Sequence, residues 1–267
     1  MNCPKCGAAN EVGLTVCGTC GAALTEAAES ASAPVSAVPS PIAPKHVFKD
    51  LKVLTRWLQG LLIADMVVSV VAGVSRFGEV QTLQLMRDGA FSSEAEMMAA
   101  AEASDARQQL IGFGTFGLLI VIIIVFAMWI YRSCANVHAL GARDLKITPG
   151  WSVGWFFVPI ANLWMPYKGM SQIMRASRNP MNWQAENAGP LVGWWWFFYL
   201  FGNITNTIVT KIAENAETIE ELITASSLTT GSYVLDLLST GAALMLVRTI
   251  HKHQSQAADR SLSAVFA

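Results

Sequence analysis

The uncharged stretch LLIVIIIVFAMWIY, residues 118–131, decides the fold of this chain. A helix needs about 20 apolar residues, at about 1.5 Å each, to cross the hydrocarbon core of a bilayer. This stretch extends back to residue 110 without a charged side chain. Hydrophobic residues make up 53% of the chain and charged residues only 14%, where a soluble domain has about 25% charged residues. The sequence therefore predicts an integral membrane protein.

Three more stretches have the length and composition of membrane helices, and a fifth apolar patch does not. The predicted spans are 57–75, 110–131, 190–210 and 231–250. The patch GWSVGWFFVPIANLWMP, residues 150–166, is shorter and is interrupted by Pro159, which favours a re-entrant or interfacial element over a crossing. We call it the Trp-rich segment. The expected fold class is an all-α integral membrane protein with a four-transmembrane-helix bundle.

The charges between the predicted spans alternate in sign. Loop 76–109 carries three basic and six acidic residues, loop 132–189 six basic and two acidic residues, and loop 211–230 one lysine and four glutamates. Loops rich in lysine and arginine stay in the cytoplasm. The pattern predicts a multi-pass membrane protein with cytoplasmic N- and C-termini. A full crossing by the Trp-rich segment would break this pattern.

Two CxxC pairs, Cys3-Pro-Lys-Cys6 and Cys17-Gly-Thr-Cys20, stand ahead of the membrane region. Their C-x2-C-x10-C-x2-C spacing can place four thiolates tetrahedrally around one Zn²⁺. About twenty residues bury too little apolar surface to fold alone, so the metal would supply most of the folding free energy. A redox dithiol, the alternative, normally opens a helix in a thioredoxin-like unit, and none follows. We predict a zinc ribbon over residues 1–24, with structural Zn²⁺ as the cofactor.

The remaining boundaries follow from composition. Residues 25–46 are dominated by alanine, serine and proline, which predicts a disordered linker. We expect a membrane domain over residues 47–253 and a C-terminal tail over 254–267. A cytoplasmic location suits the ribbon, because reducing conditions keep its thiolates available for a metal.

The runs WIYRSCANVHALG, residues 129–141, and TPGWSVGWFFVPIANLWMPYKGMSQIMRAS, residues 148–177, together resemble an uncharacterised bacterial membrane family, domain of unknown function 4328. The resemblance covers about 50–260. It implies a four-helix membrane protein with a Trp-rich centre, often preceded by a zinc ribbon or a disordered linker. It implies no known activity, and therefore no catalytic residues.

The Trp-rich segment also has a physical interpretation. Tryptophans are favoured at headgroup depth, and prolines interrupt a helix and free carbonyls that Asn162 or water could satisfy. Either an inner-leaflet anchor or a re-entrant element lining a ligand or lipid cavity fits this pattern. The basic residues Lys168, Arg175 and Arg178, which follow, would be attracted to anionic lipid. The membrane-interface motif comprises Trp151, Trp155, Pro159, Asn162, Trp164 and Pro166.

Polar residues inside the predicted spans form a candidate intramembrane site of Asp65, Asn203, Asn206 and Asp236. A carboxylate at the centre of a span costs about 2.5–3.5 kcal/mol on insertion scales, so it usually faces protein or water. The alternative is that these groups only hydrogen-bond across helices. We find no basic residue at the depth of Asp65. The depths of Asp65 and Asp236 differ by roughly 8 Å, which is unsuited to a shared-proton pair.

These features leave two main functional hypotheses. The first is a membrane-anchored adaptor or sensor whose cytoplasmic zinc ribbon binds a protein partner. The second is a small-solute or ion transporter or channel that uses the intramembrane polar residues. An intramembrane enzyme is a third hypothesis, but the chain has no H-E-x-x-H, P-loop or G-x-S-x-G motif, so we expect no enzymatic activity. In the ribbon, Lys5 is offset by Glu11, so we expect no nucleic-acid binding. A homo-oligomer is compatible with either hypothesis.

Overall fold

The structure, a computed structural model, describes residues 1–3, 5–22, 24 and 46–266. The chain divides into two compact units, Met1–Lys45 and His46–Ala267. The first unit contains the two CxxC pairs. The predicted linker over residues 25–46 lies outside the described residues, apart from His46.

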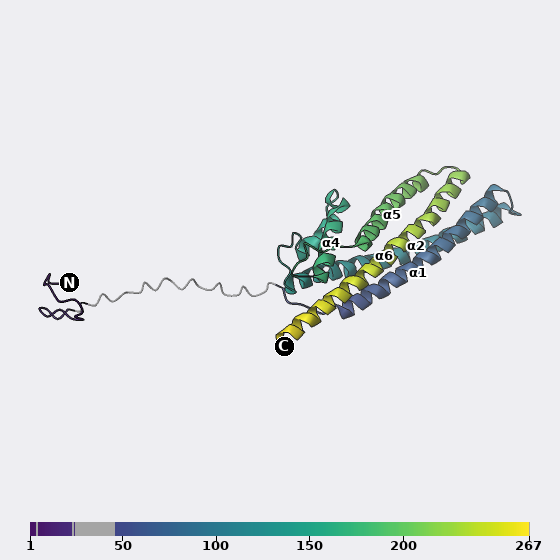
Figure 1. Cartoon of the computed structure of the whole chain (residues 1–267). Coiled ribbons are helices and arrows are strands. Elements are labelled where there is room, and N and C mark those ends of the chain that lie inside the picture. Colours follow the sequence, from purple (N-terminus) through teal and green to yellow (C-terminus); the bar gives the residue numbers. More distant parts are fainter. Residues whose placement is uncertain (4, 23, 25–45, 267) are drawn as a thin grey trace. The chain divides into compact units, whose positions relative to one another are not determined.

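The second unit is built from helices alone, with no strand among its described residues. The expected all-α class is therefore confirmed. In chain order (Figure 1) the elements are α1 (Lys52–Arg87), α2 (Glu94–Ala139), α3 (Pro149–Gly154), the 3-10 turns η1 (Trp155–Phe157) and η2 (Ala161–Leu163), α4 (Met165–Arg178), α5 (Pro190–Glu214) and α6 (Ile219–Phe266).

Three helices in the described part of the chain, rather than the expected four, are long and apolar enough to cross a membrane. They are α1, α2 and α6, and they indicate membrane insertion. The expected third span falls in α5, which is 25 residues long. Much of α5 is aromatic or polar, with the run WWWFFY at 194–199 followed by asparagines and threonines. Indole and phenol rings carry polar atoms, so such a helix is less hydrophobic than one of leucine and isoleucine.

The long helices continue well beyond the predicted spans. With 36, 46 and 48 residues in α1, α2 and α6, their lengths are about 54, 69 and 72 Å at 1.5 Å per residue. A hydrocarbon core is only about 30 Å thick. The residues of the predicted tail, 254–267, are helical as far as Phe266, where α6 ends. No glycine or proline interrupts residues 251–266, so nothing in the local sequence ends the helix.

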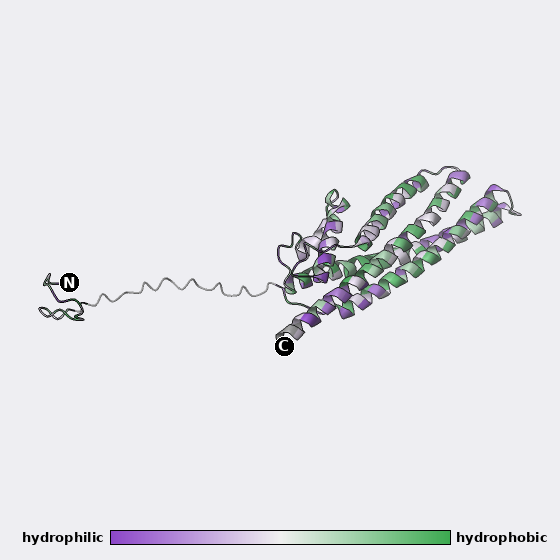
Figure 2. Ribbon diagram, in the orientation of Figure 1, coloured by the Kyte–Doolittle hydropathy of each residue, from purple (hydrophilic) through white to green (hydrophobic). Residues whose placement is uncertain are grey.

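The helices form a bundle in which α6 packs against both α1 and α5, and α2 packs mainly against α1. The α1–α2 and α5–α6 connections lie at the same end of this bundle, opposite its C-terminal end (Figure 1). Apolar residues follow the middle of the helices, and hydrophilic residues gather at the connections (Figure 2). The largest buried side chains lie at the C-terminal end of the bundle, among them Leu58, Trp129, Met174, Trp195 and Leu246.

A tight turn at Gly141 ends α2 and directs the chain toward the Trp-rich segment. Gly141 has φ 92°, a conformation that glycine adopts without strain. Its N–H donates to the carbonyl of His138, and the N–H of Ala142 donates to that of Val137, each at 3.1 Å. This is the pair of hydrogen bonds of a Schellman motif, which satisfies the last carbonyls of a helix.

Candidate functional site

The two CxxC pairs form two equivalent turns. In the first, the Gly7 N–H donates to the Cys3 carbonyl at 2.8 Å; in the second, the Gly21 N–H donates to the Cys17 carbonyl at 2.9 Å. Gly7 has φ 72° and Gly21 has φ 69°, so both glycines adopt a backbone conformation that other residues rarely take. Each turn therefore brings its two sulfurs to the same side of the backbone.

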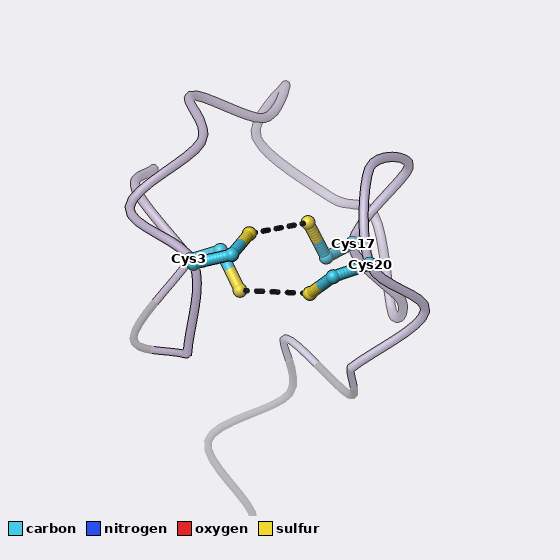
Figure 3. Close-up of side chains that lie close together, drawn as sticks. Cys3, Cys17 and Cys20 are labelled. Atoms are coloured by element: carbon cyan, nitrogen blue, oxygen red, sulfur yellow. Dashed lines mark hydrogen bonds between the residues drawn. The ribbon is translucent and has the colours of Figure 1, made fainter.

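The two turns face each other and bring four thiols together (Figure 3). The Sγ atoms of Cys3 and Cys20 lie 3.7 Å apart, as do those of Cys6 and Cys17. All four sulfurs lie within 4.8 Å of one another, and the four cysteines form no disulfide. This set of atoms can hold one metal ion, and the spacing of the cysteines alone predicted it.

Asn10 supports this cluster in a way that the cysteine spacing does not predict. Its Nδ2 donates to the Sγ of Cys17 at 3.4 Å, and its Oδ1 accepts from the Gly18 N–H at 3.0 Å. Backbone N–H groups of Thr19 and Cys20 are the main reason why the pKa of the Cys17 thiol is lowered to about 6. The thiolate is the form of cysteine that binds metals.

The membrane unit brings Asp65 and Asp236 to the interface of α1 and α6. The Thr240 hydroxyl donates to Asp65 Oδ2 at 3.0 Å, and the Ser69 hydroxyl donates to Asp236 Oδ2 at 2.6 Å. Each helix thus supplies one carboxylate and, four residues later, one hydroxyl. Because α1 and α6 run in opposite directions, each carboxylate of one helix faces the hydroxyl of the other.

These two pairs give each carboxylate a separate partner. Asp65 is half-buried and Asp236 is exposed on the surface of the chain. Among the described residues neither carboxylate forms an ion pair, since the three pairs found involve Arg76 and Arg87. The repeated D-x3-[ST] spacing was visible in the sequence. Only the antiparallel packing of α1 on α6, however, places the hydroxyl of each helix beside the carboxylate of the other.

Asn203 and Asn206 do not join this group. The Asn203 side chain donates to the Tyr199 carbonyl of its own helix at 2.7 Å. Both asparagines are exposed on α5, and no hydrogen bond connects either one to Asp65 or Asp236 in the described part of the chain. The four residues predicted as one polar site therefore separate into a carboxylate–hydroxyl arrangement and an exposed surface of α5.

The Trp-rich segment folds as a short helical hairpin. It begins with α3, at whose start Thr148 accepts from the Trp151 N–H and Pro149 occupies the first turn. The rings of Trp151 and Trp155 stack with their centroids 4.4 Å apart. Pro159 is exposed between the two 3-10 turns, and Trp164 precedes α4. No single helix in this segment is long enough to cross a bilayer.

One carbonyl of this hairpin accepts a hydrogen bond from a residue outside the segment. Trp196 of α5 donates from Nε1 to the Leu163 carbonyl at 3.2 Å. Asn162 is half-buried, and its Oδ1 has no hydrogen-bond partner among the described residues. The packing of α5 on the hairpin, which the local sequence does not encode, brings the Trp196 indole to this carbonyl. Pro166, the last residue of the motif, is buried at the start of α4.

A buried amide network was missed by the sequence reasoning. Gln172 of α4 accepts from the N–H groups of Lys146 and Ile147 and donates to the Ile147 carbonyl. Gln254 of α6 donates to the Ser133 carbonyl and the Ser177 hydroxyl. The local sequence carries no clear signal for these roles, since Gln254 lies in the polar run HKHQSQ, residues 251–256. Their partners lie on other helices or in the loop before α3, so only the packing of the chain identifies them.

A family model described as "Domain of unknown function (DUF4328)" matches residues 92–252. The match runs from the start of α2 into α6 and includes the Trp-rich segment, whereas α1 and the cysteine turns lie outside it. It is therefore narrower than the resemblance over about 50–260. No curated protein and no solved structure matches the chain. Because the matched residues form more than half of the sequence, the chain belongs to the family described as domain of unknown function DUF4328.

Proposed function

We propose that this protein is a membrane-anchored adaptor or sensor whose cytoplasmic zinc ribbon binds a protein partner. The observation that carries this proposal is the apolar surface of the ribbon itself. Val12 is 92% exposed, Val16 51% and Leu14 45%, and all three lie between the two cysteine pairs. Three exposed apolar side chains within five residues of a small module support an interaction surface, because water is a poor environment for them.

The geometry of the thiols supports zinc as the metal. Four sulfurs bound tetrahedrally at about 2.3 Å from one Zn²⁺ lie about 3.8 Å from each other. The closest sulfur pairs are 3.7 Å apart. Four cysteine ligands close the coordination sphere, so the metal would be structural and would leave no open position for a substrate. Its contribution would be the free energy of folding of the ribbon.

Native mass spectrometry of gently extracted full-length protein tests this proposal. Wild type should carry one zinc and a bound protein partner. The quadruple variant Cys3/Cys6/Cys17/Cys20→Ala should lose both, while Cys134→Ala, a change in the remaining cysteine, should lose neither. Val12→Ser with Leu14→Ser should keep the zinc and lose the partner. A partner retained by both ribbon variants would overturn the docking role.

For the topology, we propose that α5 accompanies α6 across the inner membrane as a fourth crossing, with both termini in the cytoplasm. The support is that α5 packs along α6 and that both helical hairpins turn at one end of the bundle (Figure 1). Ser92→Cys and Ala216→Cys, placed in these two turns in a Cys134→Ala background, should both react with an impermeant thiol reagent added outside the cell. Reaction of Ser92→Cys alone would show that α5 does not cross.

Ion or small-solute transport is the second candidate, and the reciprocal carboxylate–hydroxyl pairs of α1 and α6 favour it. Intramembrane carboxylates commonly mark proton or ion pathways. Wild-type protein in liposomes should then carry a proton or cation flux that Asp65→Asn abolishes. Asp105→Asn, a change in an exposed carboxylate of α2, should leave the flux intact. No wild-type flux for protons, sodium or potassium would reject this candidate.

A further inference from the structure

An open apolar groove of about 450 Å³ runs along α5 beside the start of α4. Its volume lies in the range of about 300–1,000 Å³ that is typical of ligand-binding clefts. Tyr167 of α4 contributes one wall. The other lining residues come from α5 and include Trp196, Leu200, Phe201 and Ile204. None of the residues that line the groove is charged, so its walls suit a hydrocarbon chain.

A cationic face on α4 begins at the end of this groove. Lys168, Ser171, Arg175 and Arg178 follow one another at intervals of three, four and three residues, which places them along one side of the helix. Lys168 comes directly after Tyr167, the residue that borders the groove. Among the described residues neither Lys168 nor Arg175 forms an ion pair with a carboxylate. Arg178 donates to the Asn187 carbonyl.

Two polar atoms on this face lack partners. Ser171 is only 7% exposed and Arg175 is half-buried. Ser171 Oγ and Arg175 Nε are buried atoms, and neither has a hydrogen-bond partner in the described part of the chain. Buried polar atoms are nearly always paired, so each such atom requires an explanation. A guanidinium and a hydroxyl one helical turn apart are suitable donors for a phosphate, which accepts charge-assisted hydrogen bonds.

We propose that this groove and the cationic face of α4 bind one anionic phospholipid. An acyl chain lies in the groove along α5, and the phosphate lies on the face formed by Lys168, Ser171 and Arg175. The charge complementarity selects an anionic over a zwitterionic lipid, and the membrane supplies the ligand. The hairpin that precedes α4 exposes apolar side chains at Phe157 and Ile160, which would hold this part of the protein at the bilayer. The proposal is independent of the zinc ribbon.

The test is native mass spectrometry of the full-length protein in mixed micelles that contain equal amounts of phosphatidylglycerol and phosphatidylcholine with matched chains. Wild type should retain one phosphatidylglycerol with a preference of about tenfold or more, because two unpaired cations favour the anion. Arg175→Gln with Ser171→Ala should reduce that preference toward unity. Lys252→Gln, which removes an exposed cation of α6, should leave it unchanged.

A second variant tests the groove separately from the charges. A Cβ at Gly193, which lines the groove, would meet no neighbouring atom within 4 Å, so Gly193→Leu should fill the groove without disturbing the fold. It should abolish lipid retention. Gly112→Leu on α2, where a Cβ also has open space, is the matched control and should retain the lipid.

The outcomes are decisive even if a charge variant is unstable. Helix content measured by circular dichroism identifies variants that misfold, and the exposed Lys168→Gln then replaces the Arg175 variant. Equal retention of the two lipids by wild type would overturn the proposal. Retention of phosphatidylglycerol by well-folded Gly193→Leu at the wild-type level would also overturn it.

Discussion

The side chain of Asn136 forms hydrogen bonds with both backbone polar groups of Lys49, the N–H and the carbonyl. Its Oδ1 accepts from the Lys49 N–H at 3.0 Å, and its Nδ2 donates to the Lys49 carbonyl at 2.9 Å. The same Nδ2 also donates to Oε1 of Gln254 at 3.3 Å. The Nε2 of Gln254 in turn donates to the Ser177 hydroxyl. The residues that lead into α1 are thereby connected to α2, α6 and α4.

Removal of this contact should destabilise the residues that lead into α1. We expect Asn136→Ala to lower the free energy of unfolding by about 1–2 kcal/mol, because it removes two hydrogen bonds to the Lys49 backbone and leaves Oε1 of the buried Gln254 without a partner. Hydrogen exchange of the Lys49 amide should accelerate in parallel. Thermal unfolding in detergent measures the first effect and exchange mass spectrometry the second. Asn206→Ala, in an exposed asparagine of α5, should change neither, and unaltered exchange at Lys49 would contradict the prediction.

The Asp65–Thr240 pair can be tested by a double-mutant cycle. Thr240→Val should destabilise the bundle by about 0.5–1 kcal/mol, since an intramembrane carboxylate loses its hydroxyl donor. In the double variant with Asp65→Leu this loss should disappear, because replacing both polar partners with apolar groups can be nearly neutral. Unfolding in mixed micelles, followed by circular dichroism, gives the values.

Thr249→Val is the matched control for this cycle. The Thr249 hydroxyl donates to the Met245 carbonyl of its own helix, at 2.8 Å, and has no role between helices. Its effect should be the same with and without Asp65→Leu. If the effects of Asp65→Leu and Thr240→Val simply add, the two side chains do not interact across the helix interface.

Trp196 should be more important to stability than Trp194, the exposed tryptophan of the same aromatic run of α5. Trp196→Phe keeps most of the ring but removes the Nε1–H that the Leu163 carbonyl accepts. The cost should be about 1–2 kcal/mol, because that carbonyl would have to find another donor. Trp194 is exposed, so Trp194→Phe should be close to neutral. Equal melting temperatures for the two variants would argue against the hydrogen bond.

The start of α6 should depend on pH through Glu221. Its Oε2 accepts from the backbone N–H groups of Glu217 and Thr218, at 2.8 and 3.1 Å. These hydrogen bonds hold the pKa of the Glu221 carboxyl below its ordinary value. A lowered pKa means that the stabilisation is present above the ordinary value and is lost as the pH falls through the lowered one.

Hydrogen exchange, corrected for the intrinsic effect of pH, tests this expectation at residues 217–222. In wild type the protection of these amides should fall in acid. In Glu221→Gln it should already be lower at neutral pH and should change less on acidification. Glu214→Gln, an exposed glutamate at the end of α5, should behave like wild type. Identical pH profiles for wild type and Glu221→Gln would show that the carboxylate does not support this helix start.

Local sequence patterns were sufficient to predict the elements that depend on interactions between neighbouring residues. The uncharged run at 118–131 required a membrane helix, because it is long enough to satisfy its own backbone within a bilayer. The CxxC spacing, with a glycine after each pair, placed four thiols together because each turn involves only a few consecutive residues. Pro159 similarly indicated that the Trp-rich segment would not form a single crossing helix.

Other features depended on which helices lie side by side. The sequence grouped Asp65, Asn203, Asn206 and Asp236 because all four are polar residues inside predicted spans, but a position along a helix does not specify the direction in which a side chain points around it. The packing of α1 on α6 gave Asp65 and Asp236 hydroxyl partners, while the asparagines of α5 remained exposed.

By itself, the sequence determined the all-α membrane class and the cysteine cluster, since hydrophobicity and the geometry of short turns are properties of neighbouring residues. Only the tertiary structure decided the partner of the Leu163 carbonyl, the contact of Asn136 with Lys49 and the groove beside α4. Each of these joins residues that are far apart in the chain. The physical reason is that the specific pairing of distant polar and apolar groups arises from the mutual packing of helices, which no local pattern encodes.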